Sequence, residues 1–160
     1  MKSLISRRRT CHLKSLGFTL MEIIVTVAIV VILGAIAMPL YSGYMEHSRV
    51  ESAVADIGAI SLRIESYYSD HNAFPASLAD VGYDTYRDPW GNPYQYFNNQ
   101  TGKGNGQARK DRFLVPLNTD YDLYSMGKDG DSKPPLTAKV SKDDVIRANN
   151  GAYIGPALGF

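Results

Sequence analysis

Four aspartates near the carboxyl end of the chain offer a set of oxygen ligands: Asp129, Asp131, Asp143 and Asp144. They lie in a segment, residues 126–144, that also contains Gly and Pro and is therefore expected to form a loop. Calcium is a hard cation that takes about six to eight oxygen ligands, so it is the metal that such a loop would hold. An EF-hand is excluded, because with Asp129 as the first ligand the twelfth position is Val140 rather than glutamate. A solvated acidic turn without an ion is the alternative.

A single carboxylate interrupts an otherwise uncharged apolar segment near the other end of the chain. Glu22 is the only charged residue from Phe18 to Leu40. A carboxylate inside hydrocarbon is costly and normally finds a partner. Glu22 therefore either pairs with a positive group or reaches back to the lipid headgroups.

No residue pattern typical of catalysis stands out. The sequence has no Ser-His-Asp order, no HExxH and no phosphate-binding glycine loop, and we do not expect an enzyme. Of the three histidines, His47 and His71 are expected on the surface, and His12 lies in a basic amino-terminal segment. That segment also holds the only cysteine, Cys11, so the rest of the chain cannot form a disulfide.

Charge is distributed unevenly along the chain. Five of the 17 basic residues precede Phe18 and all 16 acidic residues follow it, so the chain beyond Gly17 carries 12 basic and 16 acidic residues. The basic residues have no interleaved aromatics and lead directly into the apolar segment. We therefore expect no binding to nucleic acid.

The apolar segment predicts a membrane helix. Residues 18–40 are 23 residues long and would span about 35 Å, enough to cross a hydrocarbon core of about 30 Å. The preceding basic residues place residues 1–17 in the cytoplasm and send residues 41–160 outward. A cleaved secretory signal peptide, cut near Gly34–Ala37, is the alternative, but its apolar core would be unusually long.

The remaining elements are a helix and a small sheet. Apolar residues recur at three- and four-residue steps from Val50 to Tyr67 or Tyr68, which predicts that the helix continues as an amphipathic helix to about Asn72. A further helical turn is expected within residues 75–82. Strands are expected at 94–97, 112–116 and 121–125, with an exposed loop over 98–110. The apolar tail, residues 149–160, either covers the sheet or contacts a neighbouring subunit.

The residues around the start of the apolar segment resemble a known processing site. Gly17-Phe18-Thr19-Leu20-Met21-Glu22 is similar to the prepilin peptidase site of type IV pilins and type II secretion pseudopilins. The resemblance implies cleavage between Gly17 and Phe18, methylation of the new Phe18 amino group, and pairing of Glu22 with that group of a neighbouring subunit. Pro39 lies where these families often carry a proline, which either kinks the helix or lets it stretch on assembly.

Two further segments resemble the G-type major pseudopilins. Residues 88–96, Asp-Pro-Trp-Gly-Asn-Pro-Tyr-Gln-Tyr, are similar to their D-P-W-G-x-P-Y-x-Y stretch, and residues 122–130 to their D-x-x-S-x-G-x-D-G segment. Physically, the first segment also suits a turn-rich core element with a buried Trp90. The resemblance implies a calcium site with these ligands: the side chains of Asp129, Asp143 and Asp144 and the backbone carbonyls of Met126 and Ser141. Residues 131–140 are longer than the family loop and contain two lysines, which leaves the geometry of that site open.

Together these features imply a pilin-like α+β fold, in which a long amino-terminal helix packs against a small antiparallel sheet. The expected organisation is a cleaved leader (1–17), a membrane and assembly helix (18–40) and a periplasmic globular domain (41–160). The expected function is that of a major pseudopilin of a type II secretion pseudopilus, anchored in the bacterial inner membrane by a single span. Its expected partners are other copies of itself, the prepilin peptidase, other pseudopilins and an inner-membrane assembly platform.

Two alternative functions are also compatible with the sequence. The first is a type IV pilus subunit that serves adhesion, motility or another surface-fibre function; many such pilins carry a carboxyl-terminal disulfide, which this chain cannot form beyond its leader. The second is a signal-anchored periplasmic receptor or enzyme that never polymerises.

Overall fold

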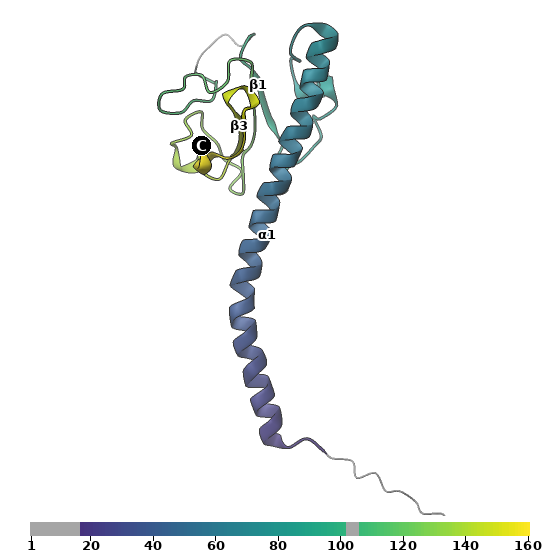
Figure 1. Ribbon diagram of the computed structural model, residues 1–160, viewed down its shortest axis with the longest axis vertical. Coiled ribbons are helices and arrows are strands. Elements are labelled where there is room, and N and C mark those ends of the chain that lie inside the picture. Colours follow the sequence, from purple (N-terminus) through teal and green to yellow (C-terminus); the bar gives the residue numbers. More distant parts are fainter. Residues whose placement is uncertain (1–16, 102–105) are drawn as a thin grey trace, which may run out of the picture. The chain divides into compact units, whose positions relative to one another are not determined.

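The structure, a computed structural model, describes residues 17–101 and 106–160. It confirms the predicted α+β fold, in which one long helix packs against a small antiparallel sheet. The expected leader, residues 1–17, lies outside the described residues except for Gly17. Two compact units divide at Ser42 and Gly43, and the helix α1 (Leu20–His71) contributes to both (Figure 1).

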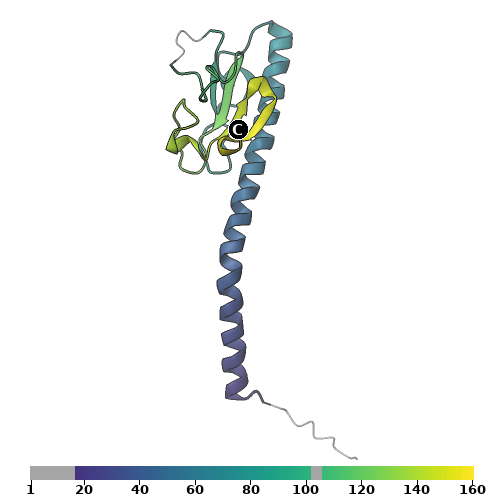
Figure 2. The same cartoon turned by 60° about the vertical axis from the view of Figure 1, so that its left-hand side comes forward.

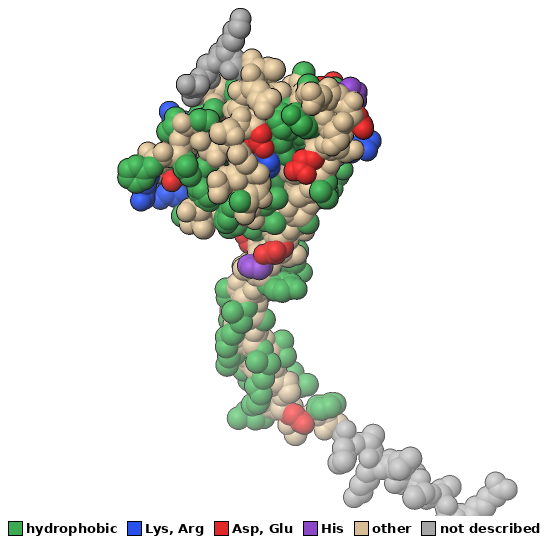
Figure 3. All heavy atoms as spheres, turned by 45° about the horizontal axis from the view of Figure 1, so that its top comes forward, with side chains coloured by type: hydrophobic (Ala, Val, Ile, Leu, Met, Phe, Trp, Pro, Cys, Tyr) green, Lys and Arg blue, Asp and Glu red, His purple; other side chains and the backbone are tan. Residues whose placement is uncertain are grey.

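The first unit consists of the apolar part of α1. Its residues from Leu20 to Leu40 are exposed, apart from the half-exposed Gly34. Figure 3 shows the hydrophobic side chains that lie along this helix. Among the described residues, α1 is the helix that is long and apolar enough to cross a membrane. Pro39 lies inside α1, and the helix continues beyond it.

The second unit is built on the carboxyl-terminal part of α1. Ala53, Ile57, Ile60 and Ile64 recur at steps of three and four, and all four side chains are fully buried against the sheet. At about 25 cal/mol per Å², burial of each isoleucine stabilises the fold by about 2 kcal/mol. The helix ends at His71, and Asn72 adopts a positive φ of 53°, which confirms the predicted end.

A short 3₁₀ helix, η1 (Leu78–Val81), follows the end of α1 and confirms the expected turn within residues 75–82. Gly82 stops it with a φ of 79°, a conformation that favours glycine. Leu78 and Val81 from this turn are buried in the same core as the isoleucines of α1.

The sheet is a four-stranded antiparallel meander in the order β1-β2-β3-β4 (Figure 2). Its strands are β1 (Gln95–Asn98), β2 (Tyr121–Ser125), β3 (Val145–Ala148) and β4 (Tyr153–Pro156). Tyr124 of β2 pairs with Gln95 of β1 on one side and with Ile146 of β3 on the other, which fixes the register of these three strands. Short 3₁₀ helices complete the chain: η2 (Lys139–Ser141), η3 (Asn149–Gly151) and η4 (Ala157–Gly159).

The two faces of this sheet are covered by different parts of the chain. Side chains alternate between faces along a strand, so Leu123 and Val145 face α1, whereas their neighbours Tyr124 and Ile146 face away. On the face away from α1, Leu117, Leu136, Ile146, Ala148 and Ala157 form a second small core. The sheet is therefore a middle layer, with α1 on one side and loop residues together with the tail on the other.

Three sequence predictions about the loops need correction. The strand expected at 112–116 is wrong; Asp111 and Leu114 instead close a tight turn by two mutual backbone hydrogen bonds of 3.0 and 2.9 Å. The loop expected to be exposed over 98–110 contains the buried residues Asn98, Ala108 and Arg109. Trp90 is half-buried rather than buried, because its indole N–H reaches out to Glu46 Oε1 at 2.9 Å.

Candidate functional site

Residues 88–96 and residues 122–130 lie side by side and are joined by hydrogen bonds. Asp88 is buried and accepts hydrogen bonds from the backbone N–H groups of Trp90 and Asn92 through Oδ1. Its other oxygen, Oδ2, accepts the hydroxyl of Ser125 at 2.5 Å. The Asn92 side chain donates to the carbonyl oxygen of Gly127 at 2.8 Å. The first segment therefore anchors the start of the acidic loop.

Gly127 lets the two ends of the acidic loop approach closely. It has a φ of 64°, and a Cβ at this position would lie 2.4 Å from the carbonyl oxygen of Asp143. Asp143 Oδ2 accepts the backbone N–H groups of Lys128 and Asp129 at 3.0 and 3.1 Å. A side chain at position 127 would push these groups apart, so glycine is required there on both conformational and steric grounds.

Asp144, the neighbour of Asp143, is fully buried and paired with a cation from the chain itself. Its Oδ2 lies 2.5 Å from Nη2 of Arg109, whose side chain is also almost fully buried. Oδ2 also accepts the hydroxyl of Ser132 at 2.6 Å, and Ser132 in turn accepts a hydrogen bond from Nη1 of Arg109. Burial raises the pKa of Asp144, while the hydrogen bond from Ser132 and the charge of Arg109 act in the opposite direction. The guanidinium also lies 4.1 Å from the centre of the Tyr124 ring.

The other expected calcium ligands lie in the same loop. The side chains of Asp129 and Ser141 already have hydrogen-bond partners within the chain. Asp129 Oδ1 accepts the N–H of Asp131 at 2.9 Å. The hydroxyl of the buried Ser141 exchanges two 2.9 Å hydrogen bonds with the backbone of Lys133. Met126 directly follows β2 and is half-buried. Within residues 17–101 and 106–160, no three acidic or histidine side chains gather as a metal-binding group.

The donor chemistry of the loop nevertheless fits a hard cation. The buried Oδ1 of Asp144 has no hydrogen-bond partner among the described residues, and the expected ligands are all oxygen atoms. The carbonyl oxygen of Asp143 is also brought into the turn at Gly127. Calcium would therefore find acceptable ligands here, although Arg109 holds one oxygen of Asp144.

The expected processing and assembly residues lie at the start of α1. Gly17 and Phe18 precede the helix, and Phe18 is 78% exposed, so the peptide bond between them is accessible. Glu22 lies in the first turn of α1, where its backbone N–H bonds to the hydroxyl of Thr19 at 3.2 Å. A carboxylate in the first turn also interacts favourably with the positive end of the helix dipole.

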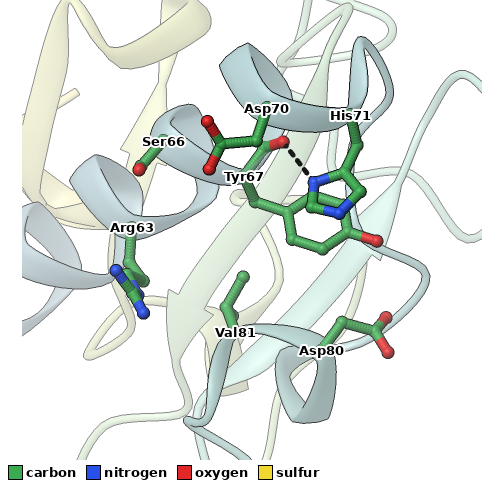
Figure 4. Close-up of a pocket in the computed structure, with 7 residues that line it drawn as sticks. All are labelled: Arg63, Ser66, Tyr67, Asp70, His71, Asp80 and Val81. Carbon is green, nitrogen blue, oxygen red and sulfur yellow. Dashed lines mark hydrogen bonds between the residues drawn. The ribbon is translucent and has the colours of Figure 1, made fainter.

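A polar surface pocket lies where α1 ends beside η1 (Figure 4). Arg63 and Asp70 of α1 and Asp80 of η1 line it, together with Ser66, Tyr67, His71 and Val81. The His71 ring stacks on that of Tyr67 at 4.1 Å, and its Nδ1 lies 3.0 Å from the Tyr67 carbonyl oxygen. His71 and His47 are both exposed, as expected. The ring of His71 is thus engaged with its own helix.

Sequence reasoning missed Arg109 as a member of the site. Arginine is rarely buried without a partner, and a Gly- and Asn-rich surrounding sequence gave no sign of burial. Arg109 also stands at the start of the charged run Arg-Lys-Asp-Arg, residues 109–112, so its charged neighbours predicted an exposed position and no local signal could have singled it out. Comparison of the chain with family models, curated proteins and solved structures found no match.

Proposed function

We propose that this chain is a filament subunit of the pseudopilin type, cut after Gly17 and anchored by α1 until it polymerises. One observation supports the proposal most. The exposed apolar part of α1, with Glu22 as its single charge, begins at Leu20, two residues beyond the Gly17–Phe18 bond, and the helix continues into a helix-and-sheet domain. Such a helix needs an apolar environment, which is either a membrane or other copies of the same helix.

The charge of Glu22 favours an ordered assembly. In a bundle of these helices the carboxylate is removed from water and needs a cationic partner. Cleavage after Gly17 creates a new amino group at Phe18, one turn away on the same helix end. In an assembly, the amino group of one copy neutralises Glu22 of the next and thereby sets the axial position of each subunit.

The globular unit favours a pseudopilus over other filaments. The segment around Trp90 and the acidic loop, which resemble G-type pseudopilins, are tied together through Asp88 and Ser125. In this function the polymer pushes folded proteins through an outer-membrane channel. The subunit works with the prepilin peptidase, the other pseudopilins and an inner-membrane assembly platform, and its globular domain is periplasmic.

Calcium would serve this function as a structural ion. Asp129, Asp143 and Asp144 with the carbonyls of Met126 and Ser141 would hold it, and its positive charge would hold the acidic loop against the sheet. Arg109 already does part of this by pairing with Asp144. The loop would then be fixed from two sides, by an ion and by a buried guanidinium.

The experiment that tests the function is secretion by a strain that carries the chain with its own secretion genes. Deletion of the chain should stop an exoprotein from reaching the medium. The double change Asp143→Ala and Asp144→Ala should also stop it, while the precursor of this variant is still cut after Gly17. Unchanged secretion in the deletion, with loss of surface fibres or motility, would move the chain to the type IV pilus subunits. Unchanged secretion and unchanged fibres in the deletion would contradict both the pseudopilin and the type IV pilus assignment.

A further inference from the structure

An apolar surface remains exposed on the side of the globular unit away from α1. It consists of a tight turn and the tail, and we call it the tail patch: Phe113, Leu114, Val115, Leu158 and Phe160. Phe113 is 96% exposed and Leu158 73% exposed. Figure 3 shows protruding hydrophobic side chains beside basic ones on this side of the unit. Exposed aromatic residues of this kind are typical of interaction surfaces.

The turn that carries Phe113 is held in place by the backbone. Besides the two hydrogen bonds that close the turn, Lys110 donates its N–H to Pro134 at 3.0 Å and accepts the N–H of Leu136 at 3.0 Å. Leu117 donates its N–H to the carbonyl oxygen of Arg109 at 2.7 Å. A fixed turn loses little conformational entropy on binding, so Phe113 is preorganised for contact with a partner.

The tail patch borders a groove with a positive rim. Leu136, Ala157, Leu158 and Phe160 line the groove together with Arg112 and Lys142. Lys110 lies in the adjoining hollow beside Val115. Against these three cations stands one acid, Asp111, so the rim carries a net charge of +2. The complementary partner is an apolar ridge flanked by negative charge.

The outer face of α1 has this character. At 100° per residue, one stripe lies within about 70° of the direction opposite the buried isoleucines, and its residues are Glu51, Ser52, Ala55, Gly58, Ala59, Leu62, Glu65, Ser66, Ser69 and Asp70. Leu62 stands at the centre of the stripe and is 70% exposed. The stripe contains three acids and no lysine or arginine, and its small residues allow a second chain to approach closely.

These two surfaces of one molecule face in opposite directions. The stripe lies on the side of α1 turned away from the sheet, and the tail patch lies over the sheet face that α1 does not cover. The tail patch of one copy therefore cannot contact the stripe of the same copy. Two copies related by a twofold axis also cannot pair both tail patches with both stripes. Such a head-to-tail contact repeats in one direction and builds an open chain.

We propose that the tail patch of one copy docks on the outer stripe of α1 in the next copy, with Phe113 beside Leu62 and Arg112 and Lys142 beside Glu65 and Glu51. This inference rests on the proposed function, because it names the partner surface between the globular units of a polymer. Contact with a membrane is the other use of a basic, aromatic surface, and it is an outcome of the test below.

The first test is disulfide cross-linking between two differently tagged full-length chains, produced together with the assembly machinery in a Cys11→Ser background. One chain carries Leu62→Cys and the other Phe113→Cys, so that a disulfide can form only between copies. We expect a mixed-tag dimer after mild oxidation. The matched control replaces Phe113→Cys by Ser77→Cys, an exposed position outside both surfaces, and should give no such dimer.

The second test exchanges the charges across the contact. Arg112→Glu with Lys142→Glu should abolish the Leu62–Phe113 cross-link, and Glu51→Lys with Glu65→Lys in the partner copy should restore it. All four positions are exposed, and unchanged thermal unfolding of the detergent-solubilised chain checks that the variants fold. Rescue by the opposite reversal separates a direct contact from a general loss of solubility.

The outcomes distinguish this surface from the proposed function. If the wild-type chain polymerises but the Leu62→Cys and Phe113→Cys chains give no mixed-tag dimer, or if charge reversal has no effect on that dimer, the assigned contact is wrong and the proposed function stands. If charge reversal instead releases the chain from vesicles of anionic lipid without changing the polymer, the tail patch is a membrane surface and the inference is overturned. If the wild-type chain never polymerises, both the assigned contact and the proposed function are wrong.

Discussion

Arg109 and Asp144 form the buried ion pair that joins the acidic loop to the body of the globular unit. Removal of one partner of such a pair leaves an uncompensated buried charge, which costs about 3–5 kcal/mol. We therefore expect Arg109→Met to lower the free energy of unfolding by this amount. The single tryptophan, Trp90, provides a fluorescence signal for unfolding of the full-length chain by urea in detergent.

The matched control is the double variant Arg109→Met with Asp144→Leu, which removes both charges. It should recover a substantial part of the lost stability, because no buried charge is then left without a partner. A single variant as stable as the wild type would show that Asp144 is satisfied by something other than Arg109.

Calcium removal tests the metal prediction at the same loop. A ligand that binds only the folded state at a concentration about 100 times its Kd stabilises that state by about 2.7 kcal/mol. We expect a chelator to lower the Tm of the full-length chain, calcium to restore it and magnesium to restore it less well. The shift should be absent in Asp143→Asn. A Tm that changes with neither chelator nor calcium would favour the solvated acidic turn without an ion.

Tyr94 makes the fold sensitive to alkali. Burial raises the pKa of Tyr94 first of all, and the hydrogen bond that its hydroxyl donates to Asp56 Oδ2 at 2.8 Å raises it further. Because the folded-state pKa lies above the unfolded value of 10.0, the stabilisation is fully present below that pH and is lost as the pH rises through the folded-state value.

We therefore expect the urea midpoint to fall steeply above about pH 10, and tyrosinate absorbance from this residue to appear only with unfolding. Tyr94→Phe should be less stable at neutral pH but should lose less stability above that pH. An equal decline in the variant and the wild type would show that other groups control the alkaline limb, among them Tyr96, whose pKa burial also raises.

At the scale of elements, α1 has one face that stabilises the sheet and one that is free to bind. Ile60 is fully buried, whereas Leu62, two residues on, is 70% exposed. Ile60→Ala should therefore cost about 2–5 kcal/mol of unfolding free energy, and Leu62→Ala less than about 0.5 kcal/mol. Urea unfolding of both variants provides the comparison. Similar losses in the two would mean that α1 packs in a different rotation.

The helix could be predicted from the sequence because its signals are local. The step pattern of Ile57, Ile60 and Ile64 and the stop at Asn72 depend on near neighbours in the chain. The strands β1 and β2 were expected within a residue or two. Strands β3 and β4 were not expected, because Arg147 and Ala148 in β3 and Gly155 and Pro156 in β4 are not typical strand residues, and these strands form through pairing with each other and with β2.

The candidate site was only partly predictable for the same reason. Asp143 and Asp144 stood out by type, but the partner of Asp144 is Arg109, 35 residues away. The strand expected at 112–116 was wrong because the apolar residues Phe113 to Val115 were assigned to a core that they do not join. An exposed apolar run and a buried strand have the same composition, and only the tertiary structure separates them.

At the scale of the whole molecule, the chain combines a helix that needs an apolar partner with a globular unit that has two complementary surfaces. The apolar part of α1 can be satisfied in a membrane or among its own copies. The outer stripe and the tail patch would add contacts between globular units. The charge of Glu22 favours the arrangement in which each helix meets the amino end of another.

The most direct test of the central claim is the amino-terminal residue of the chain in its polymerised form. Filaments would be sheared or extracted from cells that contain the prepilin peptidase and the assembly machinery, and the chain in them analysed by mass spectrometry. We expect a polymer whose chain begins at methylated Phe18. A chain that stays monomeric, keeps its first 17 residues, or is cut within residues 34–37 would contradict it.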